Sequence, residues 1–247
     1  DHKTIKNILK TDELLKEIGV KPRAFSPDRL RIRFNYSRGG DLRLIGHLEV
    51  ARLFIRALKR ARFSLNYSKG FHPHPKVSFL DPLPLGVESE DEYMDVELTG
   101  PTIPKDQLIK RLTDELPSGL EILGADYIPL QLPSLSAMIK AQKFIISFKN
   151  KPLGLSIDIN RIDGFLRDFE EKEEMKELFS NRGIDKLIDL KPLLADLSFS
   201  LDKLELRFTL NKLSGGGVKP HQLISHILGL PPGSSTLIPI RKLKTVF

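Results

Sequence analysis

Alternation of apolar and polar residues marks the first strand of this sequence. From Leu30 to Tyr36 every second residue is apolar, and arginine or asparagine stands between them. A period of two predicts a strand with one buried face. From His47 to Arg62 apolar residues instead recur every three or four positions, which predicts an amphipathic helix. The first 28 residues predict one or two short helices followed by a linker punctuated by proline.

The same two periods continue along the rest of the chain. The first half goes on with strands at Val77–Leu80 and Tyr93–Leu98, a helix at Pro104–Leu116 and a strand at Leu120–Ile128. The second half contains a strand at Lys143–Lys149, a long acidic helix at Arg161–Phe179, strands at Leu193–Leu201 and Lys203–Leu210, a helix at Pro220–Leu228 and a strand at Leu237–Val246. Both halves therefore have the order strand-helix-strand-strand-helix-strand, which is typical of the ferredoxin-like arrangement.

This order predicts an α+β protein made of two ferredoxin-like halves in tandem. A helical extension or linker at 1–28 precedes the first half at 29–130, and the second half spans 138–247. The halves join near Pro129–Ala137, a stretch that contains two prolines.

Composition excludes several kinds of chemistry. The 247 residues include no cysteine, so the chain can form no disulfide, thiolate nucleophile or cysteine-ligated metal site, and it cannot hold a cysteine-ligated iron–sulfur cluster. No apolar run is long enough to span a bilayer and the first residues do not resemble a signal peptide. We therefore expect a cytoplasmic protein that makes no membrane contact.

The positive charge is concentrated in one part of the chain. The formal net charge is +7, and residues 38–76 contain nine Lys or Arg against two acidic residues. This segment alone carries the excess of the whole chain, which indicates a local polyanion-binding surface.

The predicted helix at 47–62 carries an arginine row. Arg52, Arg56 and Arg60 recur every four residues, with Lys59 beside them, on the side opposite the apolar residues. Guanidinium groups in such a row suit phosphates, although a solvated helix face that pairs with acids elsewhere in the fold is the alternative.

The loop after this helix combines aromatic, imidazole and lysine side chains. It contains Tyr67, Lys69, Phe71, His72, His74 and Lys76. Aromatic rings that stack on unpaired bases, with cations that hold the backbone, are typical of single-strand recognition. The alternatives are that the two aromatic residues belong to the core, or that the two histidines bind a metal with His47 or a carboxylate as third ligand.

Charge reverses after this loop. Seven acidic residues and no Lys or Arg lie between Val77 and Pro104. Carboxylates of this kind solvate a strand edge, act in acid–base catalysis or hold a hard cation. The catalytic candidates are Asp95, Asp91 and His47. The acidic helix is a solvated face or a surface for a basic partner.

Residues 29–98 carry a set of motifs that resembles a known family. The motifs are Arg31-Ile32-Arg33-Phe34, Gly40-Asp41-Leu42-Arg43-Leu44-Ile45-Gly46-His47-Leu48, Arg56-Ala57-Leu58-Lys59-Arg60-Ala61, Tyr67–Lys76, Leu83–Glu90 and Tyr93-Met94-Asp95. Together they resemble the radical SAM-linked protein family, a domain of unknown function that also occurs fused to B12-binding radical SAM enzymes. Gly46 and Glu49 depart from the serine and aspartate usual in that family.

The resemblance implies a B12-binding radical SAM enzyme as partner and a setting in tRNA or rRNA modification. We expect an accessory RNA-binding module that presents structured RNA to that enzyme, with no cofactor or metal of its own. The expected nucleic-acid contacts are Arg43, Arg52, Arg56, Lys59, Arg60, Tyr67, Lys69, Phe71, His72, His74 and Lys76. The alternatives are a nucleotide-modifying enzyme with a layout similar to pseudouridine synthases, and a protein–protein adaptor that does not contact RNA.

Overall fold

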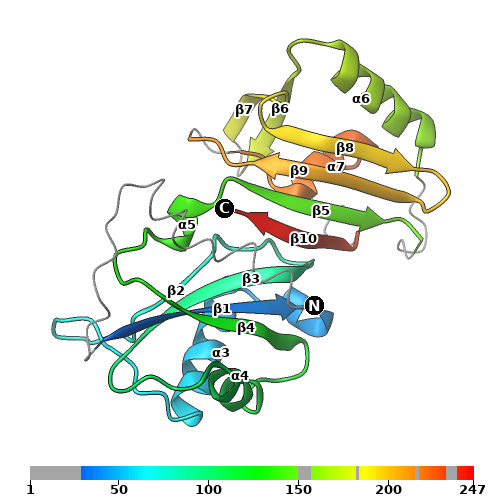
Figure 1. Cartoon of the computed structure of the whole chain (residues 1–247). Helices are drawn as coiled ribbons and strands as arrows, with labels where there is room; N and C mark the ends of the chain where they lie inside the picture. Colours follow the sequence, from blue (N-terminus) through cyan, green and yellow to red (C-terminus); the bar gives the residue numbers. More distant parts are fainter. Residues whose placement is uncertain (1–28, 150–156, 182–183, 215–216, 232–237) are drawn as a thin grey trace. The chain divides into compact units, whose positions relative to one another are not determined.

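The computed structural model describes residues 29–149, 157–181, 184–214, 217–231 and 238–247 (Figure 1). The predicted extension at 1–28 lies outside these residues. The chain divides into two compact units. The described part of unit 1 comprises 29–82, 91–138 and 247, and that of unit 2 comprises 83–90 and 139–246 apart from the gaps. The protein is of mixed α+β class, as predicted, and its described residues contain five α-helices.

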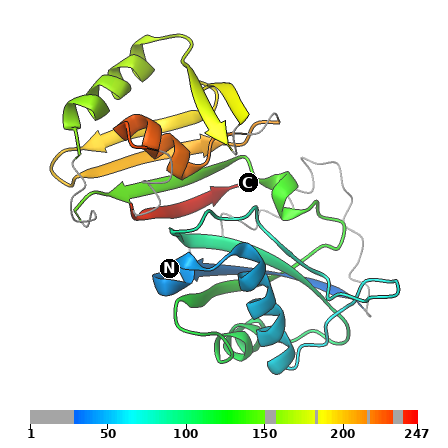
Figure 2. The ribbon, with the colours of Figure 1, turned by 180° about the vertical axis from the view of Figure 1, so that it is seen from behind.

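Unit 1 is a sheet covered on one face by two helices. Its elements are β1 (Leu30–Arg38), a 3-10 turn η1 (Gly40–Leu44), α3 (His47–Arg60), β2 (Val77–Phe79), β3 (Val87–Leu98), α4 (Lys105–Thr113), β4 (Leu120–Ile128) and α5 (Leu135–Met138). The strand order is β4-β1-β3-β2, and the first four residues of β3 belong to unit 2. Figure 2 shows α3 and α4 on the same side of this sheet.

The core of unit 1 follows from the alternation in β1. Leu30, Ile32, Phe34 and Tyr36 are each at most 4% exposed and pack with α3 and α4. In β3 the even-numbered residues from Met94 to Leu98 join the same core. The odd-numbered residues of both strands consequently point to the opposite face of the sheet.

Unit 2 contains main-sheet strands with two helices on one face (Figure 2). Its elements are β5 (Ala141–Ser147), α6 (Ile159–Glu171), β6 (Lys176–Asn181), β7 (Ile184–Asp189), β8 (Leu194–Ser200), β9 (Glu205–Asn211), α7 (Pro220–Leu228) and β10 (Ile240–Val246). The main strands lie in the order β10-β5-β9-β8, and β10 also pairs in parallel with residues 87–89. Phe144, Leu206 and Phe208 pack against α6 and α7 in its core.

Two segments differ from the predicted elements. The acidic helix ends at Glu171 rather than Phe179, and the following residues form β6, which pairs with β7 as an antiparallel hairpin. β3 begins at Val87, six residues before the predicted start. The helix at Pro220–Leu228 is confirmed, because proline suits its first turn and Gly229, at φ 64°, ends it in the left-handed region.

Candidate functional site

The loop at 67–75 in unit 1 is a closed β-type loop with an aromatic tip. Tyr67 and Pro75 form an isolated bridge, and the Ser68 amide donates to the His74 carbonyl at 2.9 Å. The Ser68 hydroxyl accepts from the His74 amide at 3.0 Å. These contacts hold the base of the loop, so that its tip projects into solvent.

The aromatic residues of this loop are not core residues. Phe71 is 102% exposed and Tyr67 is 41% exposed, so the core alternative is wrong for both. Lys69, His72 and His74 are exposed beside Phe71. A fully solvated phenyl ring between cationic and imidazole side chains offers a stacking surface for an unpaired base.

The arginine row of α3 is only partly available to a ligand. Arg60 is engaged by Glu115, since its Nε lies 2.7 Å from the carboxylate and its NH2 group 2.6 Å from the Glu115 carbonyl. Arg52 is exposed and makes a loose ion pair of 3.7 Å with Glu49. Arg56 and Lys59 are exposed and form no ion pair with any residue that the structure describes.

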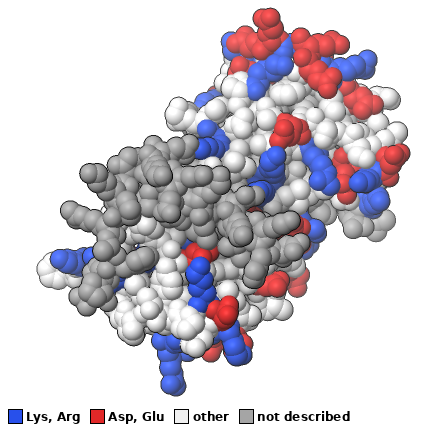
Figure 3. All heavy atoms as spheres, viewed as in Figure 1, with Lys and Arg blue, Asp and Glu red and all other residues white. Residues whose placement is uncertain are grey.

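Two other predicted phosphate contacts are tied to the protein itself. Lys76 lies 3.4 Å from Glu97, and Arg43 donates to the Gly40 carbonyl at 3.1 Å. Among the residues coloured in Figure 3, basic and acidic side chains are interspersed over the face in view. The cations best placed for an external anion are therefore Arg52, Arg56, Lys59 and Lys69, and the predicted set of nucleic-acid contacts stays a prediction.

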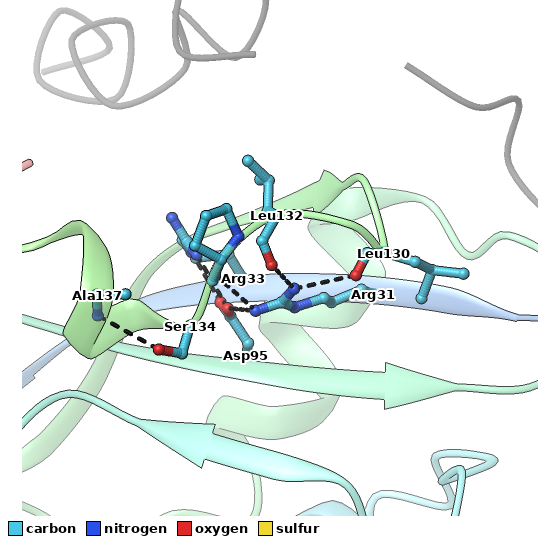
Figure 4. A network of polar contacts seen from close by, with 8 residues as sticks. Arg31, Arg33, Asp95, Leu130, Leu132, Ser134 and Ala137 are labelled. Atoms are coloured by element: carbon cyan, nitrogen blue, oxygen red, sulfur yellow. Dashed lines mark hydrogen bonds and ion pairs between the residues drawn. The ribbon is translucent and has the colours of Figure 1, made fainter. Parts of the chain in front are cut away.

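A buried ion-pair centre occupies the face of the unit 1 sheet opposite the helices (Figure 4). Asp95 is 2% exposed and accepts from Arg33 at 2.7 and 2.9 Å and from Arg31 at 2.7 Å. Arg31 also donates to the carbonyls of Leu132 at 2.7 Å and Leu130 at 3.3 Å. Both carboxylate oxygens of Asp95 accept hydrogen bonds from guanidinium groups, so this centre holds β1, β3 and the chain after β4 together.

Asp91 belongs to a second buried polar group on this face. Its Oδ1 accepts from the Tyr93 hydroxyl at 2.6 Å and from the Asn35 amide at 2.9 Å. Burial, reinforced by the neighbouring Asp91 carboxylate, raises the pKa of Tyr93 far above its usual range. Asp91, Glu92 and Asp95 are all less than 9% exposed, so the reading that they solvate a strand edge is wrong for these three.

His47 lies on the other side of the same sheet. It is the first residue of α3, and its ring makes an edge contact with Phe79 at 5.8 Å between centroids. Phe79 packs against the helix-covered core. Burial lowers the pKa of His47; the charge of Glu92 opposes that shift and the charge of Arg38 adds to it.

Because the pKa of His47 is lowered in the folded protein, the free energy of unfolding should depend on pH. The unfolded imidazole titrates near 6.5, so between that value and the lower folded pKa the unfolded state binds more protons. The free energy of unfolding should therefore fall as the pH decreases from about 7 through this window. We expect His47→Gln to remove this part of the pH dependence in urea denaturation between pH 7.5 and 5.5. If the free energy of unfolding falls with pH equally in the variant and the wild type, the prediction is wrong.

The three catalytic candidates do not converge on one site. Asp91 and Asp95 lie on the face of the sheet that carries Arg31 and Arg33, whereas His47 lies on the helix side. Sequence analysis did not single out Arg31 and Arg33 as site residues, nor Arg38 and Glu92 as neighbours of His47. The alternation in the strands predicted which side chains share a face of the sheet, but no sequence signal showed which segments cover each face. The catalytic assignments stay predictions.

The described residues contain no group of three or more His, Asp or Glu side chains arranged to hold a metal ion. The exposed residues His72 and His74 therefore belong to no such group among the described residues. Within the same residues, no helix is long and apolar enough to cross a membrane.

Comparison with known protein families gives a match over most of the chain. Residues 31–220 match the family described as an uncharacterized protein conserved in bacteria, DUF2344. The matched segment covers most of the first unit and reaches the start of α7 in the second. No curated protein matches the sequence.

Proposed function

The chain belongs to the bacterial family DUF2344, and we propose from its own geometry that it is an RNA-binding accessory module. The observation that carries the proposal is the solvated ring of Phe71 at the tip of a loop whose base is closed by hydrogen bonds. A large apolar side chain held away from the core contributes little to folding, so a ligand that stacks on it explains its place.

The surroundings of Phe71 support a nucleic acid as that ligand. Lys69, His72 and His74 flank the ring in the loop, and exposed Arg52, Arg56 and Lys59 on α3 belong to the same unit. Unpaired bases present the planar faces that stack on aromatic rings, while phosphates attract the cations. A single-stranded or looped part of a structured RNA has both features.

The partner that we propose is a B12-binding radical SAM enzyme acting on tRNA or rRNA in the cytoplasm. The support is the resemblance of the motifs at 29–98 to the radical SAM-linked family, and the absence of cysteine from the chain. A protein without cysteine cannot carry the cluster that such chemistry requires, so the cluster would belong to the partner.

We also propose that each unit is built on the ferredoxin-like plan. In unit 1 the strand order β4-β1-β3-β2 places the fourth strand beside the first, followed by the third and the second. The main strands of unit 2, counted along the chain, have the same order in β10-β5-β9-β8. The β6–β7 hairpin is then an insertion between the first helix and second strand of the plan.

Binding of labelled single-stranded RNA, followed by fluorescence anisotropy, tests the function. Loss of one stacked base should weaken binding by about 1–3 kcal/mol, so Phe71→Ala should raise the Kd by roughly 5- to 150-fold. Leu201→Ala is the matched control, because Leu201 is 60% exposed but lies in unit 2. It should leave the Kd unchanged.

Salt dependence gives a second readout of the same experiment. Each phosphate contact with a single strand contributes about −0.7 to the slope of log K against log salt concentration. Arg52→Ala combined with Arg56→Ala should make that slope shallower by about 1.4. An unchanged Kd in Phe71→Ala together with a flat salt response would rule out the proposal.

A further inference from the structure

The β6–β7 hairpin of unit 2 exposes two leucines that face each other across the strands. Leu178 pairs directly with Leu187, and they are 59% and 60% exposed. On the opposite face of the hairpin, Phe179 is buried and Ile188 packs against the core of unit 2. The hairpin is thus anchored through one face, and the leucine pair is not needed for that anchoring.

Acidic side chains surround the leucine pair. Strand pairing places Asp185 opposite Ser180 and Asp189 opposite Lys176, on the same face as the leucines. Lys176 is already held by Glu174 at 2.5 Å, just before β6. The local charge beside the apolar pair is therefore mainly negative.

The end of α6 extends this acidic surface. Glu170, Glu171 and Glu173 are exposed and form no ion pair with residues in the described part of the chain, whereas Asp168 is paired with Lys172 at 2.8 Å. These carboxylates precede β6 by only a few residues. In a chain of net charge +7, this region has the opposite sign to the exposed cations of unit 1.

We propose that the leucine pair and its acidic surround form a docking surface for an apolar, basic segment of another protein. Apolar side chains of that segment would cover Leu178 and Leu187, and its Lys or Arg side chains would face Asp185 and the carboxylates at the end of α6. Exposed apolar pairs on a two-stranded hairpin favour unwanted strand association unless a partner covers them. Charge complementarity selects a basic partner over an acidic one.

Synthetic peptides provide the probe, with the full chain as receptor. A labelled nonapeptide of alternating leucine and lysine should bind at least about tenfold more tightly than the same peptide with glutamate in place of lysine, a difference of about 1.4 kcal/mol. Leu178→Ser combined with Leu187→Ser should weaken the lysine peptide by a further factor of about ten or more.

Leu201→Ser is the matched control for the double variant. Leu201 has the same 60% exposure but lies in the turn after β8, so this substitution should change the Kd by less than about twofold. Far-UV circular dichroism should be unaltered in both variants, because the replaced side chains are mostly solvated. RNA affinity should also be unaltered, which separates this surface from the loop of unit 1.

Three outcomes would overturn the proposal. The first is a double variant that binds the lysine peptide as well as the wild type, and the second is equal weakening by Leu201→Ser. The third is a wild type that sediments as a dimer while the double variant sediments as a monomer, because a second copy of the chain would then be the occupant.

Discussion

Asp95→Ala should lower the free energy of unfolding by about 3–5 kcal/mol, since removal of one partner leaves buried charges without compensation. Asp95 is the only carboxylate that the described contacts place on both Arg31 and Arg33, and all three residues are at most 9% exposed. Two guanidinium groups would then remain in a dry interior, with Arg31 still bound to backbone carbonyls. Urea denaturation followed by circular dichroism measures the loss.

Glu97→Ala provides the matched control, because Glu97 lies two residues further along β3 and also pairs with cations. Burial raises the pKa of Glu97, but bonds from Arg29, Asn66 and Lys76 outweigh this and lower it overall. The ion pairs are partly solvated, with the Glu97 side chain 23% and that of Arg29 45% exposed. Its loss should cost less than about 1 kcal/mol.

A rescue variant separates charge burial from a general packing defect. Replacement of Arg31 and Arg33 by Met together with Asp95→Leu removes all three charges, and such exchanges are often neutral or stabilising. We expect this variant to be more stable than Asp95→Ala alone. If Asp95→Ala costs less than about 1 kcal/mol, or the triple variant is the less stable, the ion-pair centre does not hold this face together.

The faces of β1 could be predicted from the sequence, but their surroundings could not. Leu30, Ile32 and Phe34 are buried as their alternation indicated. Arg31 and Arg33 stand at positions that usually face solvent, yet both are buried. The chain near Leu132 contacts Arg31, and the ring centroid of Phe247 lies 5.7 Å from the Arg33 guanidinium. The periodicity of a short sequence window cannot show that a segment about 100 residues away buries these side chains.

The acidic helix illustrates how tertiary contacts override a local pattern. The predicted helix runs to Phe179, and the spacing of four residues from Met175 to Phe179 is compatible with a helix. In the structure both side chains reach the core of unit 2 from the hairpin region, because β6 pairs with β7 along its whole length. A segment of a few residues can fit the helical period as well as the strand period, and pairing with a neighbouring strand then decides that it forms a strand.

The exposure of candidate ligand contacts also lay beyond sequence analysis. Phe71 and Tyr67 could equally have been core residues, and only the fold shows them in solvent. Arg60 belongs to a regular row with Arg52 and Arg56, but its partner Glu115 is 55 positions away. The row was therefore predictable, whereas the subset available to a ligand was not.

Arg38→Met should lower the free energy of unfolding by about 2–4 kcal/mol, because it leaves buried acceptors without a donor. Arg38 is 3% exposed and donates to the carbonyls of Leu42 at 3.0 Å, Arg43 at 3.3 Å and Ile45 at 2.6 Å. These bonds fix the turn that leads into α3 and His47. Urea denaturation measures the loss of stability.

The same substitution should raise the pKa of His47, because the positive charge of Arg38 contributes to lowering it. NMR titration of the imidazole reports this shift.

Arg38→Lys separates the two roles of the guanidinium. It keeps the charge, so the pKa of His47 should stay near its wild-type value, but it loses the planar fork that reaches three carbonyls. Arg56→Met, an exposed site on α3, should change the free energy of unfolding by less than about 0.5 kcal/mol. If Arg38→Met leaves the titration of His47 unchanged, the charge of Arg38 does not act on this imidazole, and burial alone accounts for its lowered pKa.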